Sequence, residues 1–242
     1  MIARQPVTTY QVKIVPSFEN VVATDYFPLQ IKNTWEYVGT ARNVAEQEKV
    51  VQKEVRVLMQ VMDITRGGNA TLFIMKGHPS DAVWAITSED ASQDVVDVPG
   101  STYGYLLIAN KVFRIPEDRL GAVRKSIEEG VMPGFIEPGI ISQADMDFEL
   151  PLFRGQVFGS PDQIARNDRS YAWHVTDSTL YHAPDKEMIK EIPCYKLVYL
   201  TRSDYTEISF VPYVGIVSFS YSHHGSKAQV DLNLQDYRIH SR

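Results

Sequence analysis

The feature that most constrains the fold of this chain is a long segment of alternating character at residues 50–65, VVQKEVRVLMQVMDIT. Successive side chains of a strand point to opposite faces, so this segment predicts one mainly apolar face and one mixed face. The apolar face carries Val51, Val55, Val57, Met59 and Val61, together with Lys53 and Asp63. A strand of this length, apolar on one side only, favours a curved antiparallel sheet.

Other strand-like segments follow one another at short spacing. Residues 66–69, Arg-Gly-Gly-Asn, predict a hairpin turn after the long strand because glycine adopts positive φ at little cost. Alternating or β-branched segments occupy residues 35–40, 71–76, 81–88, 103–109, 111–115, 171–176, 195–201, 206–211, 215–221 and 229–237. The sequence therefore predicts a mainly β fold, an antiparallel curved sheet arranged as a sandwich or a half-open barrel.

One substantial helix is predicted near residues 118–130. Its apolar residues Leu120, Val123 and Ile127 recur at spacings of three and four, and Gly130 ends the pattern. Ser160-Pro161-Asp162-Gln163 has the pattern of a capping box, which predicts a short helical turn to about residue 166. The Pro- and Gly-rich residues 132–160 are interpreted as a long irregular connection.

The chain contains no internal repeat and no low-complexity linker. We therefore expect residues 25–242 to form a single β domain, and residues 1–24, with Pro6 and Pro16, to form an extended N-terminal arm.

Composition excludes several classes of protein. With 24 Lys and Arg against 30 Asp and Glu, the formal net charge is −6, which argues against a broadly basic nucleic-acid-binding protein. The single cysteine, Cys194, excludes an intrachain disulfide and a multi-cysteine metal site, and its apolar setting predicts an inert buried thiol. No apolar run is long enough for a membrane-spanning helix, and residues 1–25 lack the pattern of a signal peptide. These observations fit a cytoplasmic protein or an exported one whose leader was removed.

Two segments carry a resemblance to a known group of proteins. Residues 26–37, YFPLQIKNTWEY, resemble the YFPL-x-x-G-N-x-W-x-Y opening of uncharacterised bacterial secreted and lipoprotein-like domains. Residues 210–217, FVPYVGIV, resemble their closing F-x-P-G-V-G-x-V segment. Lys32 and Tyr213 stand where that pattern has glycine. The resemblance implies an antiparallel β domain of the cell envelope with no assigned activity and no catalytic residues.

The candidate ligand-binding residues are aromatic residues and histidines near the two ends of the chain. Trp35 and Tyr37 share one face of a strand, and their expected role is core packing, with ligand binding as the alternative. Tyr221 and His223 share a face, whereas the adjacent His224 points to the opposite one, so the two histidines are not a ready-made metal pair. We expect no metal and no cofactor, because no recognised ligand spacing is present.

The acidic cluster at residues 145–149, Asp-Met-Asp-Phe-Glu, is interpreted as a solvated loop because it lacks the spacing of a calcium-binding loop. Three functional hypotheses remain. The first is a non-catalytic cell-envelope domain that binds a partner protein, or an apolar or glycan ligand, in the concavity of its sheet. The second is a structural subunit of a larger assembly that uses residues 1–24. The third is a hydrolase in which His223 or His224 works with the 145–149 loop.

Overall fold

The computed structural model describes residues 23–44, 50–85, 95–131, 141, 145–181, 192–225 and 228–240. The predicted arm at residues 1–24 lies outside this description except for its last two residues, which begin α1 (Ala23–Tyr26). The strands are β1 (Thr34–Val44), β2 (Val50–Gly67), β3 (Ala70–Lys76), β4 (Val95–Asp97), β5 (Thr102–Ile108), β6 (Lys111–Pro116), β7 (Met146–Glu149), β8 (Val157–Phe158), β9 (Trp173–Tyr181), β10 (Ile192–Leu200), β11 (Asp204–Val211), β12 (Gly215–His223) and β13 (Gln229–Arg238).

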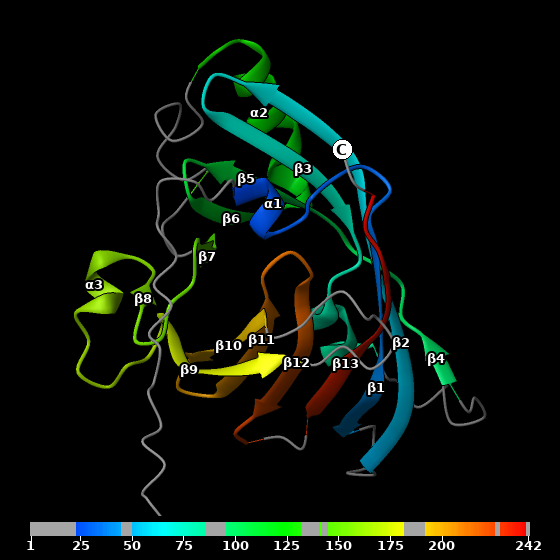
Figure 1. The fold of residues 1–242 in the computed structure, drawn as a ribbon. Coiled ribbons are helices and arrows are strands. Elements are labelled where there is room, and N and C mark those ends of the chain that lie inside the picture. The colour runs from blue at the N-terminus through cyan, green and yellow to red at the C-terminus, as the bar shows by residue number, and fades with distance from the viewer. Residues whose placement is uncertain are drawn as a thin grey trace, which may run out of the picture.

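The described strands form one sheet in the order β7-β6-β5-β3-β2-β1-β13-β12-β11-β10-β9-β8, and β4 pairs with β2 outside this path. Every pair along the path is antiparallel, and only β2 with β4 is parallel. The sheet curls until its end strands β7 and β8 contact each other, which makes a nearly closed barrel (Figure 1). The prediction of a mainly antiparallel, curved β fold is therefore confirmed.

The long strand β2 has the two faces that its sequence predicts. Val55, Val57, Met59 and Val61 are fully buried, whereas Leu58 on the opposite face is half exposed. β2 also connects the two parts of the sheet, since it pairs with β1 along one half of its length and with β3 along the other.

The predicted helix is confirmed as α2 (Glu117–Glu128), which packs against β2, β3, β5 and β6 (Figure 1). Its buried residues Val123 and Ile127 lie on the side that faces the sheet. Two strand glycines allow the helix to approach closely. A Cβ atom added at Gly104 would lie 2.6 Å from Leu120 Cδ2, and one at Gly67 would overlap the carbonyl oxygen of Ile127.

Of three local predictions, one is confirmed, one is wrong and one is wrong in part. The capping box at Ser160–Gln163 is present and begins α3 (Pro161–Ile164), as predicted. The predicted strand at residues 81–88 is wrong, because the described part forms a 3₁₀ helix, η3 (Pro79–Trp84), that His78 and Asp81 cap. The interpretation of residues 132–160 as an irregular connection is also wrong in its second part, which contains β7 and β8; residues 132–140 and 142–144 lie outside the described residues.

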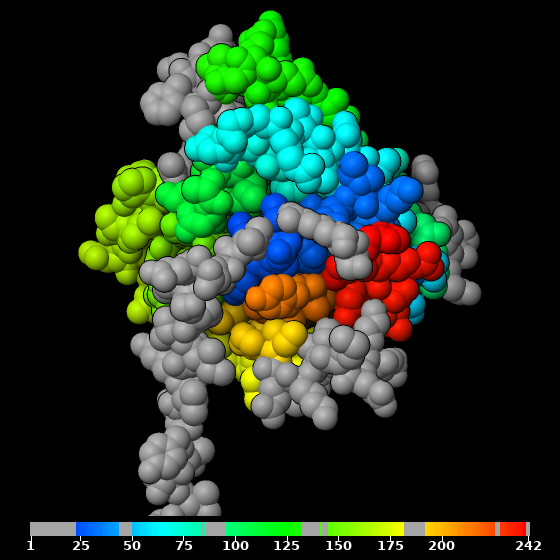
Figure 2. Space-filling model, turned by 45° about the horizontal axis from the view of Figure 1, so that its top comes forward, coloured from blue at the N-terminus to red at the C-terminus, as the bar shows by residue number. Residues whose placement is uncertain are grey.

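The two segments that carry the sequence resemblance pack on each other. The indole Nε1 of Trp35 donates a hydrogen bond to the carbonyl oxygen of Val214 at 2.6 Å, and the Tyr37 hydroxyl donates to that of Ile216 at 3.0 Å. The backbone N–H of Tyr213 donates to the carbonyl of Tyr26 at 2.8 Å. Figure 2 shows the result, with the blue first described residues lying between cyan β2–β3, the orange β12 region and red β13.

Aromatic rings from both segments and from the middle of the chain fill the interior beside this contact. The ring centroid of Phe27 lies 5.3 to 5.5 Å from those of Tyr105, Phe148 and Phe210. Gly215, at φ 105°, is required here because a Cβ atom would lie 3.0 Å from the Phe27 ring. The core therefore joins residues from the beginning, middle and end of the described chain.

Candidate functional site

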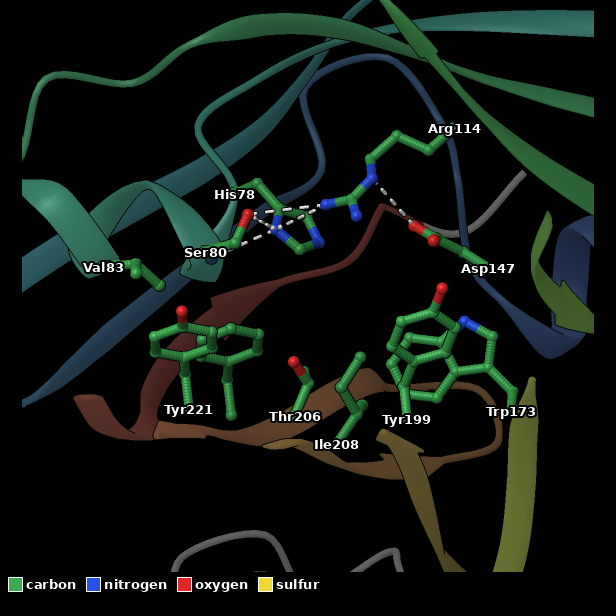
Figure 3. A pocket seen from close by; sticks show the side chains of 11 residues that line it. His78, Ser80, Val83, Arg114, Asp147, Trp173, Tyr199, Thr206, Ile208 and Tyr221 are labelled. Carbon is green, nitrogen blue, oxygen red and sulfur yellow. Dashed lines mark hydrogen bonds and ion pairs between the residues drawn. The ribbon is translucent and has the colours of Figure 1, made fainter. Parts of the chain in front are cut away.

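A cavity of about 410 Å³ opens beside this aromatic core. One wall comes from η3, β6 and β7 and is polar, and the opposite wall comes from β9 to β12 and is mainly aromatic and apolar (Figure 3). Its volume is within the range of pockets that hold small ligands.

The centre of the polar wall is an ion pair between Arg114 on β6 and Asp147 on β7. The Nε atom of Arg114 lies 3.3 Å from Asp147 Oδ2, and Asp147 is 7% exposed. Burial raises the pKa of Asp147 while the guanidinium of Arg114 opposes that rise. Asp147 in turn raises the pKa of Arg114. The pair places one positive and one negative charge at the cavity, with no net charge between them.

His78 stands beside this pair and has a defined tautomer. Its Nδ1 atom accepts the backbone N–H of Ser80 at 3.1 Å and lies 3.4 Å from Arg114 Nη1. Since N–H groups approach Nδ1, the proton of the neutral ring resides on Nε2. Burial, and then the charge of Arg114, hold the pKa of His78 well below its usual value. His78 is therefore a neutral imidazole with an N–H donor at Nε2.

That donor is unused within the described residues. The Nε2 atom of His78 is buried and has no hydrogen-bond partner among them, and Figure 3 shows it directed into the cavity. A buried polar group normally has a partner, because leaving it without one costs about 1–3 kcal/mol. The wall thus holds a buried donor, of fixed position, beside the cavity.

The position of His78 is fixed by the start of η3. The carboxylate of Asp81 accepts the backbone N–H of His78 at 2.9 Å, and it also accepts the N–H of Ser101 at 2.9 Å. Together with Pro79 at the first helical position, these bonds complete the capping box that the structure shows at this turn.

The aromatic wall is a row of residues paired across four neighbouring strands. Trp173 is opposite Tyr199, Tyr199 is opposite Thr206, and Thr206 is opposite Tyr221. The rings of Trp173 and Tyr199 lie 5.2 Å apart, centroid to centroid. Ile208 and Phe219 are also opposite each other and line the cavity, two residues further along β11 and β12 than Thr206 and Tyr221. Antiparallel register therefore builds this wall from residues that are far apart in sequence.

Among the residues that the sequence singled out, Tyr221 and His223 come together on one carboxylate. The hydroxyl of Tyr221 and the Nδ1 atom of His223 each lie 2.7 Å from Oδ1 of Asp204. Burial raises the pKa of Asp204, but hydrogen bonds from His223, Tyr221, Thr201 and Ser203 outweigh it and lower the pKa to about 2. Tyr221 lines the cavity, and His223 lies behind it on the same carboxylate.

The other three candidates lie elsewhere. Trp35 and Tyr37 are fully buried in the core, and the residues that line the cavity do not include them. His224 is exposed, and its backbone N–H donates to the carbonyl of Ser203. The structure therefore separates the candidates into a core pair, a cavity-side pair and a surface histidine.

The hydrolase hypothesis needs His223 or His224 within hydrogen-bond reach of the 145–149 segment, and the described contacts of His223 and Asp147 are with other residues. His223 is paired with Asp204, whereas Asp147 of the 145–149 segment is paired with Arg114. A Ser–His contact does exist at Ser80, whose Oγ lies 2.6 Å from His78 Nδ1. A base must take up a proton near neutral pH, and the lowered pKa of His78 opposes this.

Two residues of the polar wall, His78 and Arg114, escaped prediction from the sequence, and Asp147 was considered only as part of the acidic 145–149 loop. The interpretation of residues 145–149 as a solvated loop is wrong, because Met146, Asp147 and Phe148 are all buried in β7. Alternation of Met146, Phe148 and Leu150 was the available signal for a strand. Nothing in the sequence pairs His78 with Arg114, since their contact depends on the order of strands in the sheet.

Within the described residues, no cluster of three or more His, Cys, Asp or Glu side chains is arranged to hold a metal ion. None of the described helices combines the length and the apolar character that crossing a membrane requires.

Comparison with known proteins gives two similar solved structures. No protein-family model and no curated protein matches the chain. A protein from Parabacteroides distasonis ATCC 8503, described as a candidate lipoprotein, aligns over 88% of this chain and 98% of its own, with a TM-score of 0.41 and 11% identity. A candidate exported protein with a YmcC-like fold from Bacteroides fragilis NCTC 9343 aligns over 86% and 96%, with a TM-score of 0.37 and 7% identity.

Proposed function

We propose that this protein is a non-catalytic binding protein whose ligand is a small, uncharged molecule with an apolar face and several oxygen atoms, the chemistry of a glycan. The observation that carries the proposal is the cavity with one polar and one aromatic wall. The rings of Trp173 and Tyr199, tilted by 43° to each other, offer an aromatic surface for the apolar face of a sugar ring, and Arg114 and His78 supply donors to hydroxyl oxygens.

The charges of the cavity favour an uncharged ligand over an ionic one. The charge of Arg114 is matched by Asp147, so an anion or a cation would enter without a free counter-charge from this pair. A charged ligand would lose its hydration and gain little in return. A hydroxyl group suits the pair better, because it can donate to a carboxylate and accept from a guanidinium.

The cell envelope is the proposed place of action. This part of the proposal rests on the resemblance of residues 26–37 and 210–217 to envelope domains, and fractionation of the native protein would test it.

The binding proposal is tested by calorimetric titration of the full chain with methyl glucoside, N-acetylglucosamine and maltose, and separately with palmitate. Tyr199→Leu removes a stacking ring and is expected to weaken sugar binding about 3- to 10-fold, since aromatic pairs contribute about 0.5–1.5 kcal/mol. Tyr205→Leu is the matched control, because Tyr205 precedes the cavity residue Thr206 on β11 and so faces the other way.

Saturable sugar binding that Tyr199→Leu weakens and Tyr205→Leu leaves unchanged would support the proposal. Binding of palmitate alone would assign the cavity to an apolar ligand and overturn the glycan class. Binding that both variants weaken equally would place the ligand outside the cavity.

A further inference from the structure

A second hollow lies on the opposite face of β9 from the cavity. Trp173 and His174 are adjacent on this strand, so their side chains point to opposite faces, and Trp173 lines the cavity. His174 instead lines a hollow of about 570 Å³ between the α3 turn, β8 and β9. Figure 1 shows these elements together at one side of the molecule.

The hollow is rich in positive charge although the chain as a whole carries −6. Three arginines line it: Arg154, Arg166 and Arg169. Arg166 is compensated, because its guanidinium forms two hydrogen bonds to the carboxylate of Asp168. For Arg154 and Arg169 the described residues provide no salt-bridge partner. Asp162 on α3 also interacts with Arg166, so among the described residues the guanidinium charges of Arg154 and Arg169 are the ones without a salt-bridge partner.

His174 also lines the hollow, and within the described part of the chain one of its ring nitrogens has no partner. Its Nε2 atom is buried and has no hydrogen-bond partner among the described residues. Burial lowers the pKa of His174; a hydrogen bond to the backbone of Arg169 opposes that effect, and the charge of Arg169 adds to it. An anion bound here would raise the pKa of His174 and so oppose the charge of Arg169, because a negative charge favours the protonated imidazole.

We infer that the hollow formed by Arg154, Arg169 and His174 is a binding site for a phosphate monoester group, independent of the ligand in the cavity. Guanidinium groups bind oxyanions through charge-assisted, often bidentate hydrogen bonds, and a protonated His174 would supply one more donor. Arg166 is held in place by Asp168 and Ser170, and its guanidinium lies 5.1 Å from the centre of the Tyr171 ring, so this side of the hollow is preorganised.

The test uses the full chain and inorganic phosphate at constant ionic strength, with chloride as the comparison salt. We expect saturable binding with a Kd in the millimolar range or tighter, and an upward shift of the His174 pKa followed by NMR as phosphate is added. The double variant Arg154→Gln, Arg169→Gln should weaken binding at least about tenfold, as expected for the loss of two charged hydrogen-bond donors. The control double variant Arg66→Gln, Arg202→Gln removes the same charge elsewhere and should leave binding within about twofold.

A second arm identifies the source of the phosphate group. Vesicles of phosphatidylcholine with and without phosphatidic acid are compared with soluble glucose 6-phosphate. Binding to phosphatidic acid vesicles alone would assign the site to a lipid headgroup, and binding to the soluble ester would assign it to a small metabolite, both within the inference. Equal weakening in the two double variants, or a His174 pKa that phosphate does not raise, would overturn it.

Discussion

Lys32 and Tyr213 are two of five described non-glycine residues whose backbone conformation normally favours glycine. Lys32 has φ 72° and Tyr213 has φ 67°, both in the left-handed region. These are the two positions at which the sequence departs from the glycine-containing pattern that it resembles. Both positions therefore have a conformation that a glycine would adopt more easily, and a left-handed non-glycine residue costs about 1–2 kcal/mol.

Lys32→Gly is expected to stabilise the protein by about 0.5–1 kcal/mol, measured by urea unfolding. The gain is smaller than the full strain because glycine also gains freedom in the unfolded chain. Lys76→Gly, an exposed lysine replaced within β3, is the control and should destabilise instead. A loss of stability in Lys32→Gly would show that the lysine side chain makes a contribution larger than the strain.

The buried His78 makes the stability of the protein depend on pH. Its pKa in the folded state is lowered, so the native ring stays neutral while the unfolded chain takes up a proton as pH falls through about 6.5. The unfolded state then binds more protons, and the free energy of unfolding decreases toward acid. Between pH 7.5 and pH 5.5 this single group is expected to remove about 1 kcal/mol.

The variant His78→Gln should reduce that pH-dependent loss by about the same 1 kcal/mol, as followed by urea unfolding at the two pH values. His224→Gln replaces an exposed histidine and should keep the slope of the wild type. An unchanged slope in His78→Gln would mean that the ring has the same pKa in the native and the unfolded state, which would contradict the lowered native pKa.

At the scale of elements, the position of α2 depends on which of its apolar residues reach the sheet. The spacing of Leu120, Val123 and Ile127 puts them on one apolar face; Val123 and Ile127 are buried, while Leu120 is only half-buried. The helical period identifies the face of a helix that packs, but not how far each residue lies beneath its neighbours.

Ile127→Ala is therefore expected to cost about 2–5 kcal/mol in unfolding free energy, whereas Leu120→Ala should cost less. Gly104→Ala tests the same contact from the strand, because its new Cβ atom would overlap the side-chain ends of Leu120 and Leu72, which must then shift. Thermal unfolding of the three variants gives the comparison. Equal losses at the two helix positions would contradict the burial that the structure shows.

The elements also show where sequence reasoning succeeds. Alternation predicted β2 and its buried face, and the capping box predicted α3, because both signals lie within a few consecutive residues. The same reasoning failed at residues 81–88 and 145–149. In η3 a local cap at His78 and Asp81 prevails over strand propensity, and in β7 the carboxylate of Asp147 is buried because Arg114 on the next strand pairs with it.

For the whole molecule, the candidate site depends on strand order, which local patterns do not contain. His78, Arg114 and Asp147 come from three elements, and the facing row from Trp173 to Tyr221 comes from four strands. Tyr221 was predicted from its position beside His223, but its place in the cavity follows from its register with Thr206. The sequence therefore predicted the fold class and, among the candidate residues that line the cavity, Tyr221.

Removal of β13 is expected to abolish cooperative folding. β13 pairs with both β1 and β12, and it buries Val230 and Leu232. A chain that ends at residue 228 leaves both neighbouring strands with unpaired edges, and its circular dichroism should show no sharp thermal transition. A chain that ends at residue 240 keeps β13 and serves as the control. A sharp transition in the shorter chain would show that the remaining strands form a stable unit.

The pairing of β1 with β13 also sets a delay during synthesis of the protein. β1 ends at Val44 and its partner begins at Gln229, so at about 5–20 residues per second the first strand waits about 10–40 s for the second. Trp35 and Tyr37 meet their hydrogen-bond acceptors, Val214 and Ile216, only shortly before that time. The nascent chain therefore carries an unpaired strand edge and unsatisfied aromatic donors until residues 214–238 have been synthesised.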